Sequence, residues 1–146
     1  MQIMVKKLRD GAKLPFLGSE AAAGADLFAC LDYNIQIIAC HSTVKIHTGI
    51  AMEIPDGYFG AVFARSGLAA KSGLRPANCV GVIDSDYRGE IIVALHNDTD
   101  EFKTVENGER IAQIVILPYM RTEYVETDTL LDTARGSGGF GSSGRK

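Results

Sequence analysis

The residues Arg65, Ser66 and Gly67 precede the one helix that the sequence predicts, Leu68–Ser72. We expect Ser66 to cap the start of this helix and Gly73 to end it. A guanidinium, a hydroxyl and an unblocked glycine amide at a helix start can together bind a phosphate. The same residues also suit an ordinary capped helix with a solvated arginine, so a phosphate site and a simple cap are both open.

An acidic segment follows between Asn78 and Glu90, where apolar residues run into carboxylates. The pattern predicts a hairpin-like arm in which Asp84 and Asp86 share one face. Asp84 comes directly after Ile83, so we expect it to be the more buried of the two. A buried, unpaired carboxyl has a raised pKa and suits general-base chemistry, although a carboxylate here can also anchor the amides of a turn.

A glutamine, Gln113, interrupts the apolar run Ile111–Leu117. A buried amide needs hydrogen-bond partners, because an unsatisfied polar group in the interior costs free energy. We expect Gln113 to bond to a neighbouring strand. The less favoured alternative is that it faces a ligand or an ordered water.

The C-terminal residues 135–146 are rich in glycine and serine and have nothing with which to build a core. Their composition predicts a flexible end. Two residues, Arg135 and Phe140, favour a different interpretation. A cation and an aromatic ring among glycines can pair with a phosphate and stack on a base.

Apolar and polar side chains alternate along much of the chain. This pattern predicts strands, and we expect these strands to position the residues named above. Turn residues separate the alternating stretches, most clearly at Pro55-Asp56-Gly57 and Asn107-Gly108. Many short strands of this kind predict an all-β sandwich, jelly roll or barrel. The strands are expected at residues 33–37, 44–47, 50–54, 58–63, 91–95 and 111–117, the last two buried on both faces.

The length of 146 residues suits one domain. The strand pattern fades from about Thr127. We therefore expect a β domain at residues 1–126, followed by an arm at residues 127–146 that ends in the glycine-rich tail.

The charge balance excludes several classes of partner. Fifteen basic residues against 18 acidic ones give a formal net charge of −3, so no broad basic surface for nucleic acid or an anionic membrane is expected. The apolar runs are strand-sized and too short to cross a bilayer, and no signal peptide is visible. We therefore expect a cytoplasmic protein that binds neither nucleic acid nor membrane.

The cysteines Cys30, Cys40 and Cys79 are odd in number and lack CxxC spacing, which argues against a disulfide framework or a zinc ribbon. We expect three buried structural thiols. The histidines lack partners at nearby spacings and are assigned to strand faces: His41, His47 and His96.

Five segments together resemble the motifs of the homotrimeric dUTP diphosphatase (dUTPase) family, in the family's order and over nearly the whole chain. The Gly-Val-Ile-Asp-x-Asp-Tyr-Arg-Gly arm and the Arg-Gly-x-Gly-Gly-Phe-Gly tail are highly specific together. One departure is Ala64, where most members carry proline. The five segments are residues 23–27, 65–67, 78–90, 107–113 and 135–144.

The resemblance implies a distorted jelly-roll-like β-barrel or sandwich with one short helix. It implies a homotrimer in which each active site is built from several subunits. The implied activity is Mg²⁺-dependent hydrolysis of dUTP to dUMP and pyrophosphate by attack of water on the α-phosphorus. That reaction lowers dUTP and supplies dUMP for dTTP synthesis.

The family's residue roles carry over to the matching positions. Asp84 would activate the attacking water, Gln113 would help to position it, and Asp26 would lie near the metal through water molecules. Tyr87 would pack on the deoxyribose and exclude a 2′-hydroxyl. The other residues expected to bind substrate are Arg65, Ser66 and Gly67 at the triphosphate, Asn78 and Val82 in the arm that holds uracil, and Arg135, Phe140 and Gly141 in a tail that closes as a lid.

Two other functions are compatible with the same fold. A dCTP deaminase is disfavoured by Asp84 and by the Phe140 tail. A nucleotide-binding protein that acts as a regulator or interaction module is the other alternative. A regulatory protein partner beside an enzymatic activity also stays open.

Overall fold

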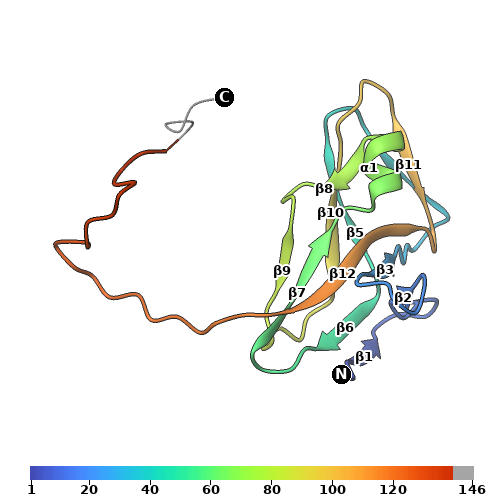
Figure 1. Cartoon of the computed structure of the whole chain (residues 1–146). Coiled ribbons are helices and arrows are strands. Elements are labelled where there is room, and N and C mark those ends of the chain that lie inside the picture. The colour runs from blue at the N-terminus through green and yellow to red at the C-terminus, as the bar shows by residue number, and fades with distance from the viewer. Residues whose placement is uncertain (140–146) are drawn as a thin grey trace.

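Short strands dominate residues 1–139, the part of the chain that this computed structural model describes (Figure 1). One helix interrupts them within that range. The expected all-β fold with one short helix is therefore confirmed. In chain order the elements are β1 (Met4–Lys7), β2 (Phe16–Leu17), β3 (Ala25–Phe28), β4 (Ile35–Ile38), β5 (Thr43–His47), β6 (Ile50–Glu53), β7 (Tyr58–Phe63), α1 (Ser66–Ser72), β8 (Leu74–Pro76), β9 (Gly81–Ile83), β10 (Ile92–Asn97), β11 (Lys103–Glu106) and β12 (Arg110–Pro118).

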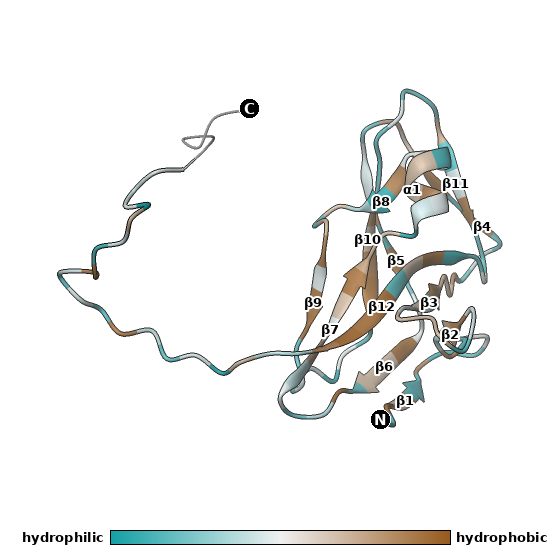
Figure 2. Ribbon diagram, in the orientation of Figure 1, coloured by the Kyte–Doolittle hydropathy of each residue, from teal (hydrophilic) through white to brown (hydrophobic). Residues whose placement is uncertain are grey.

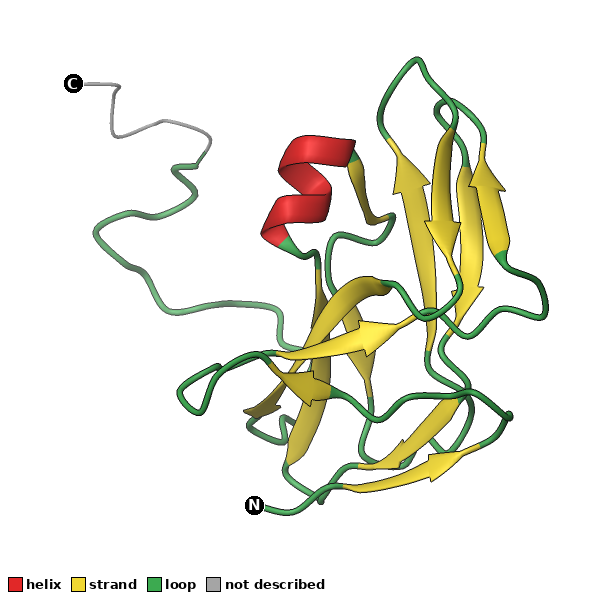
Figure 3. Cartoon of the chain, turned by 90° about the vertical axis from the view of Figure 1, so that its right-hand side faces the viewer, coloured by secondary structure: helices red, strands yellow, loops and turns green. Residues whose placement is uncertain are grey.

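The strands form antiparallel sheets, of which the largest has the order β2-β3-β12-β7-β9. Smaller sheets pair β5-β10-β8, β1-β6 and β11-β4. Figure 3 shows the helix beside the strands. The long strand β12 lies in the middle of the large sheet, so Gln113 has Asp26 of β3 on one side and Phe63 of β7 on the other. This register brings segments that are far apart in sequence to one place.

Turn chemistry determines where several strands begin. The Tyr58 N–H donates to the Pro55 carbonyl over 3.2 Å, and Gly57 between them has a φ of 81°. Gly108 has a φ of 79° in the turn that leads into β12. Positive φ favours glycine, so both predicted turns are confirmed.

The core consists of aliphatic side chains from most strands, and Figure 2 shows apolar stretches along β7, β10 and β12. Burial of each such side chain contributes about 1.5–3 kcal/mol. The prediction that β10 is buried on both faces is wrong, because Ile92 is 39% exposed while Val93 and Leu95 are buried. The largest fully buried side chains include Leu27, Ile38, Ile46, Leu95 and Ile111.

The cysteines differ in their burial, and none of the three is disulfide-bonded. Cys30 is buried in the core, as expected. Cys40 is half-buried and Cys79 is exposed, so the prediction of three buried thiols is wrong for these two. Cys79 lies in the turn before β9, with a positive φ of 61°, where the chain has no sheet to cover it.

The helix α1 begins two residues earlier than predicted. Arg65, with an extended backbone (φ −82°, ψ 127°), occupies the N-cap position and makes no side-chain capping bond. Ser66 is the first helical residue, so its prediction as the cap is wrong. Gly73 ends the helix in the left-handed conformation, as predicted, and donates to the Ala69 carbonyl over 3.2 Å.

After β12 the chain leaves the body. Tyr119 is still held there, because its ring packs edge-on against Phe59 and its N–H donates to the Gly57 carbonyl. Arg121 contacts Asp56. From there the chain runs away from the strands to residue 139 (Figure 1). Within residues 1–139, no helix has the length and apolar character needed to cross a membrane.

Candidate active site

One carboxylate, that of Asp26, holds two arginines. The Arg65 Nε donates to Asp26 Oδ1 over 2.7 Å, and the Arg110 Nη1 donates to Oδ2 over 3.1 Å. Asp26 lies on β3, whereas Arg110 begins β12 and Arg65 precedes α1. The Asp26 side chain is only 14% exposed, so its two ion pairs are partly shielded from water. The group carries one net positive charge, which suits an anionic ligand.

Arg65 is therefore not the solvated arginine of an ordinary capped helix, since Asp26 holds it. Arg110 was not predicted as a site residue. Its place directly after the turn at Asn107-Gly108, three residues before Gln113, is the sequence signal that points to it. A second contact joins the arginines, because Arg65 Nη1 donates to the Arg110 carbonyl over 3.3 Å.

Gln113 lies beside this cluster in the middle of the large sheet. Its Nε2 donates to the Ala64 carbonyl over 2.9 Å. Ala64 directly follows β7, so the partner lies just past the end of the neighbouring strand and not within it. Gly24 leaves the space for its other end, because a Cβ at Gly24 would lie 2.5 Å from Gln113 Oε1. The amide thus fixes the backbone immediately before Arg65.

The start of α1 is open to solvent beside the arginine cluster. Ser66 and Gly67 are both exposed, and a Cβ at Gly67 would meet nothing within 4 Å. A ligand can therefore approach the backbone amides here without a steric barrier. Arg65, Ser66 and Gly67 are brought together with Asp26 and Gln113.

The acidic arm is built differently from the predicted hairpin. The strand β9 is the edge of the large sheet and pairs with β7, whereas β10 belongs to another sheet. The chain pairs in this way because Gly81–Ile83 continues the sheet beside Gly60–Val62. The prediction of a β9–β10 hairpin is therefore wrong.

The expectation that Asp84 is a buried carboxyl is also wrong, since Asp84 and Asp86 are both exposed in the single chain. The strand β9 ends at Ile83, and a turn follows it. The Asp84 carbonyl accepts the Tyr87 N–H over 3.2 Å and closes that turn, so its carboxylate is not needed for the purpose.

Two shallow pockets lie along the arm and share Val82. One, of about 220 Å³, is lined by Asn78, Gly81 and Val82 together with apolar residues of β10. The other, of about 300 Å³, is lined by Val82 and Asp84 together with two aromatic rings, Phe59 and Tyr119. Apolar walls with a few polar groups are typical of ligand sites.

Tyr87 is folded back on its own segment. Its hydroxyl donates to the Glu90 carbonyl over 2.9 Å. The ring crosses Gly89, where a Cβ would lie 2.6 Å from Tyr87 Cζ. Tyr87 is 44% exposed, so one face of a rigidly placed ring is available to a ligand.

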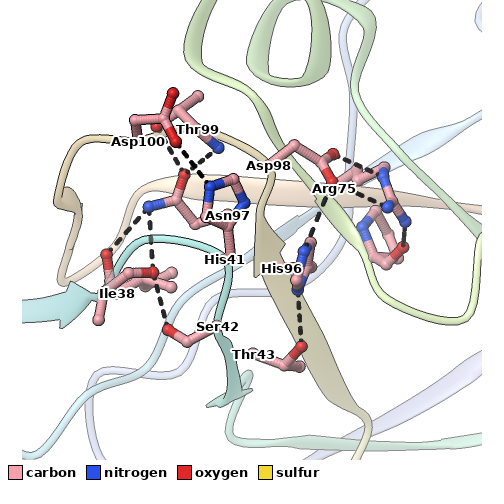
Figure 4. A network of polar contacts seen from close by, with 12 residues as sticks. Ile38, His41, Ser42, Thr43, Arg75, His96, Asn97, Asp98, Thr99 and Asp100 are labelled. Atoms are coloured by element: carbon pink, nitrogen blue, oxygen red, sulfur yellow. Dashed lines mark hydrogen bonds and ion pairs between the residues drawn. The ribbon is translucent and has the colours of Figure 1, made fainter.

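The histidines have partners that their sequence spacing does not reveal. His47 and His96 lie on β5 and β10, as expected, but His41 lies in the turn between β4 and β5 with a φ of 51°. His41 Nε2 is 2.8 Å from Asp100 Oδ1, and His96 Nδ1 is 2.9 Å from Thr43 Oγ1 (Figure 4).

The polar network in Figure 4 includes buried Asn97, whose Nδ2 donates to the Ile38 carbonyl over 3.2 Å. The same nitrogen donates to the Glu101 carbonyl over 2.7 Å. Arg75 donates from Nε and Nη2 to the two carboxylate oxygens of Asp98. The hydrogen bond from Arg75 is the main reason that the pKa of Asp98 lies below its usual value. The polar side chains of this network find their partners within the chain, so the network holds loops in place.

The tail residues do not join the cluster in the single chain. Arg135 is exposed, and its Nε donates to the nearby Gly138 carbonyl over 2.8 Å. Figure 1 shows this segment away from the strands. Phe140 and Gly141 lie outside the described residues.

Metal-ligating side chains are sparse in this region. Residues 1–139 contain no group of three or more His, Cys, Asp or Glu side chains that could hold a metal ion. Asp26 contacts the arginine at the helix start, and both of its oxygens already accept from arginines. A site with so few protein ligands fits a hard cation such as Mg²⁺. This ion keeps much of its water shell and binds together with a polyphosphate.

Comparison with known proteins covers nearly the whole chain. The family described as dUTPase matches residues 10–144. A protein named deoxyuridine 5'-triphosphate nucleotidohydrolase from Hydrogenobaculum sp. (strain Y04AAS1) is 49% identical over 146 residues, covering 100% of both chains. A protein of the same name from Desulfitobacterium hafniense (strain DSM 10664 / DCB-2) is 54% identical over 133 residues, covering 90% of this chain and 87% of that one.

A solved structure is also similar throughout. It is that of the Staphylococcus bacteriophage 80alpha dUTPase G164S mutant with dUpNHpp. The TM-score is 0.87 at 28% identity, and the match covers 98% of each chain. The strands and the arm described above are therefore shared with proteins of this kind.

Proposed function

Because the chain belongs to the dUTPase family, we propose that it hydrolyses dUTP to dUMP and pyrophosphate at the cluster of Asp26, Arg65 and Gln113. The observation that carries this proposal is the convergence of three separate motifs on that cluster, through the Asp26–Arg65 ion pair and the Gln113–Ala64 hydrogen bond. The reaction lowers dUTP and supplies dUMP for dTTP synthesis.

The triphosphate binds at the start of α1. Arg65 and Arg110 supply positive charge there, while Ser66 and Gly67 supply a hydroxyl and backbone amides. Phosphoryl transfer depends on positioning and charge neutralisation more than on covalent chemistry. A few placed cations suffice, which agrees with a chain whose formal net charge is −3.

Asp84 acts as the general base. Its carboxylate takes a proton from a water molecule, whose oxygen attacks the α-phosphorus while the bond to the bridging oxygen of the leaving pyrophosphate breaks. Gln113 helps to hold this water through its amide oxygen, which faces Gly24, and a phosphate oxygen through the Nε2 N–H that Ala64 does not use. Exposure of Asp84 in the single chain leaves it accessible to such a water.

The nucleoside is held by the arm and the tail. Backbone groups near Asn78 and Val82 bind the polar edge of uracil, and the small volume of their pocket, about 220 Å³, disfavours a 5-methyl group. Tyr87 packs on the deoxyribose and leaves no room for a 2′-hydroxyl. In the lid, Phe140 and Gly141 cover the base and Arg135 binds the terminal phosphate.

A magnesium ion fits this arrangement. Asp26 would hold it through water molecules, and the phosphate oxygens would supply its direct ligands. When bound, the ion neutralises charge on the phosphates. The chain's own residues then place the α-phosphorus and the water.

A homotrimer with shared active sites is part of the proposal. In the single chain the tail lies away from the cluster, so the site is incomplete. A groove of about 600 Å³ is lined by apolar residues such as Leu14, Leu17 and Ile116, and Tyr124 and Leu131 are almost fully exposed. An assembly would bury such surfaces.

The division into a β domain at residues 1–126 and an arm at residues 127–146 belongs to the same proposal, as does a cytoplasmic location. No described feature favours a dCTP deaminase or a purely regulatory protein.

The test is release of pyrophosphate from dUTP, dTTP, UTP and dCTP with Mg²⁺ present. We expect rapid release from dUTP and slow release from the other three. Equal rates on all four would contradict the proposal, and ammonia release from dCTP would favour the deaminase. A mass measurement in solution that gives a monomer would contradict the shared site.

A further inference from the structure

We propose that Glu90 is a positioning residue for Tyr87 and thereby determines how well the enzyme rejects a ribonucleotide. The inference rests on the proposed function, because it assumes that Tyr87 packs on the deoxyribose. It gives a structural role to the charged cluster around Glu90, which takes no part in the proposed reaction.

Glu90 is the best-held carboxylate at the end of the arm. Its Oε1 accepts the Gly49 N–H over 2.8 Å, its Oε2 is 2.8 Å from His47 Nδ1, and Arg9 Nε lies 3.6 Å away. The side chain is only 16% exposed. Three separate groups from two other segments therefore fix one carboxylate.

The hydrogen on His47 can be assigned from these contacts. His47 Nδ1 lies 2.8 Å from Glu90 Oε2 and 3.1 Å from Arg9 Nη2. An ionised carboxylate only accepts, so the shorter contact requires a proton on Nδ1 that points at Glu90. His47 therefore donates to Glu90, and Arg9 adds its charge to the same carboxylate.

The backbone next to Glu90 is also hydrogen-bonded to the loop between β5 and β6. The Ile91 N–H donates to the Ile50 carbonyl over 2.9 Å, and the Thr48 hydroxyl donates to the Ile91 carbonyl over 2.6 Å. Together with the Glu90 side chain, these bonds attach the end of the arm to the loop between β5 and β6.

Tyr87 depends on the position of Glu90 through a direct bond. The Tyr87 hydroxyl donates to the Glu90 carbonyl over 2.9 Å, and the ring lies across Gly89, which has no side chain to displace it. A shift of the Glu90 backbone therefore moves the ring.

Nothing else of comparable strength holds the segment between Asp84 and Glu90 among the described residues. Its other bonds are internal, from the Tyr87 N–H to Asp84 and from Arg88 to Ser85. The strand β9 fixes one end of the segment, and the Glu90 carboxylate together with the backbone bonds of Ile91 fixes the other. Loss of the Glu90 carboxylate should loosen Tyr87 while Arg65, Asp26 and Gln113 keep their contacts.

The test compares kcat/KM for dUTP and for UTP in wild type, Glu90→Gln and Glu90→Ala. We expect the dUTP to UTP ratio to fall by about tenfold or more in Glu90→Ala, mainly because UTP becomes a better substrate relative to dUTP. The ratio should fall less in Glu90→Gln, since the amide oxygen of this variant can still accept the Gly49 N–H. The matched control is Glu106→Gln on β11, an exposed glutamate outside this cluster, which should keep the wild-type ratio.

An unchanged ratio in a folded Glu90→Ala variant would overturn the inference. A wild-type enzyme that hydrolyses dUTP and UTP equally would instead contradict the proposed role of Tyr87. If Glu90→Ala does not fold, Tyr87→Phe serves in its place, because it deletes only the hydroxyl that bonds to Glu90. Loss of discrimination in Tyr87→Phe supports the inference, and a wild-type ratio overturns it.

Discussion

Arg65 donates from Nε to Oδ1 of Asp26 over 2.7 Å, which ties the start of α1 to the strand β3. The remaining oxygen of the same carboxylate accepts from Arg110 over 3.1 Å. Because a guanidinium has several donors in a rigid plane, each arginine can keep its bond to Asp26 and still offer N–H groups to a phosphate. We therefore expect Asp26 to influence substrate binding through the two arginines that it holds.

The first prediction concerns Asp26→Asn. An asparagine cannot accept from both arginines with equal strength, because one of its two atoms is an amide nitrogen. We expect KM for dUTP to rise at least tenfold and the free energy of unfolding to fall by about 1–3 kcal/mol, as for a charged hydrogen bond lost in a partly buried place. Urea unfolding and steady-state kinetics measure the two effects.

Asp10→Asn serves as the control for Asp26→Asn, since Asp10 is an exposed aspartate. It should change neither quantity. Wild-type KM in a folded Asp26→Asn variant would show that Asp26 does not position the arginines for substrate.

The second prediction concerns Asp84→Asn. This variant should bind dUTP nearly as well as wild type, because the carboxylate is exposed and the turn is closed by the Asp84 carbonyl. Its kcat should fall by about 10²–10⁴-fold, as is typical when a general base is lost. Asp86→Asn, two residues away and also exposed, is the matched control and should retain most of the rate. Unchanged turnover in Asp84→Asn would mean that another group is the base.

Much of the local structure could be predicted from the sequence, because local chemistry decides it. The strand at 58–63 has the predicted bounds, and Gly73 ends the helix where expected. The alternation of apolar residues depends only on neighbouring residues, and so does a left-handed glycine at a helix end. Both can be predicted without knowing how the rest of the chain folds.

The predictions that were wrong concern which segments of the chain lie next to one another in the fold. The apolar residues before Asp84 indicate a strand, but they do not show that β7 is its partner. Asp84 directly follows this edge strand and is exposed. In the same way, Arg65 and Asp26 are 39 residues apart, and periodicity carries no information about such a contact. Only the resemblance to a family placed them in one site.

The third prediction concerns Gly24→Ala. A Cβ at Gly24 would lie 2.5 Å from Gln113 Oε1, and the flexible end of the glutamine would have to move away. We expect Gln113 to lose its bond to Ala64, with a stability loss of about 0.5–1.5 kcal/mol and a fall of tenfold or more in kcat. Gly18→Ala is the control, because a Cβ there meets nothing within 4 Å. A Gly24→Ala enzyme with wild-type kcat would contradict a role for the Gln113 amide in the reaction.

The fourth prediction concerns the pH dependence of stability at Glu90. Burial raises the pKa of Glu90. The hydrogen bonds from His47 and the Gly49 N–H, together with the charges of His47 and Arg9, outweigh that effect and bring the pKa below its usual 4.5. A carboxyl whose pKa is lower in the folded protein stabilises it above the unfolded value, and this contribution is lost as the pH falls through the folded value.

Wild type should therefore be more stable than Glu90→Gln at pH 7, and the difference should shrink once the pH falls below about 4.5. Urea unfolding of the two proteins at several pH values between 7 and 3 measures this difference. Other carboxylates that also have low pKa values, such as Asp98, are common to both proteins and cancel in the comparison. A gap between wild type and Glu90→Gln that stays constant down to pH 3 would show that the charge of Glu90 does not stabilise the end of the arm.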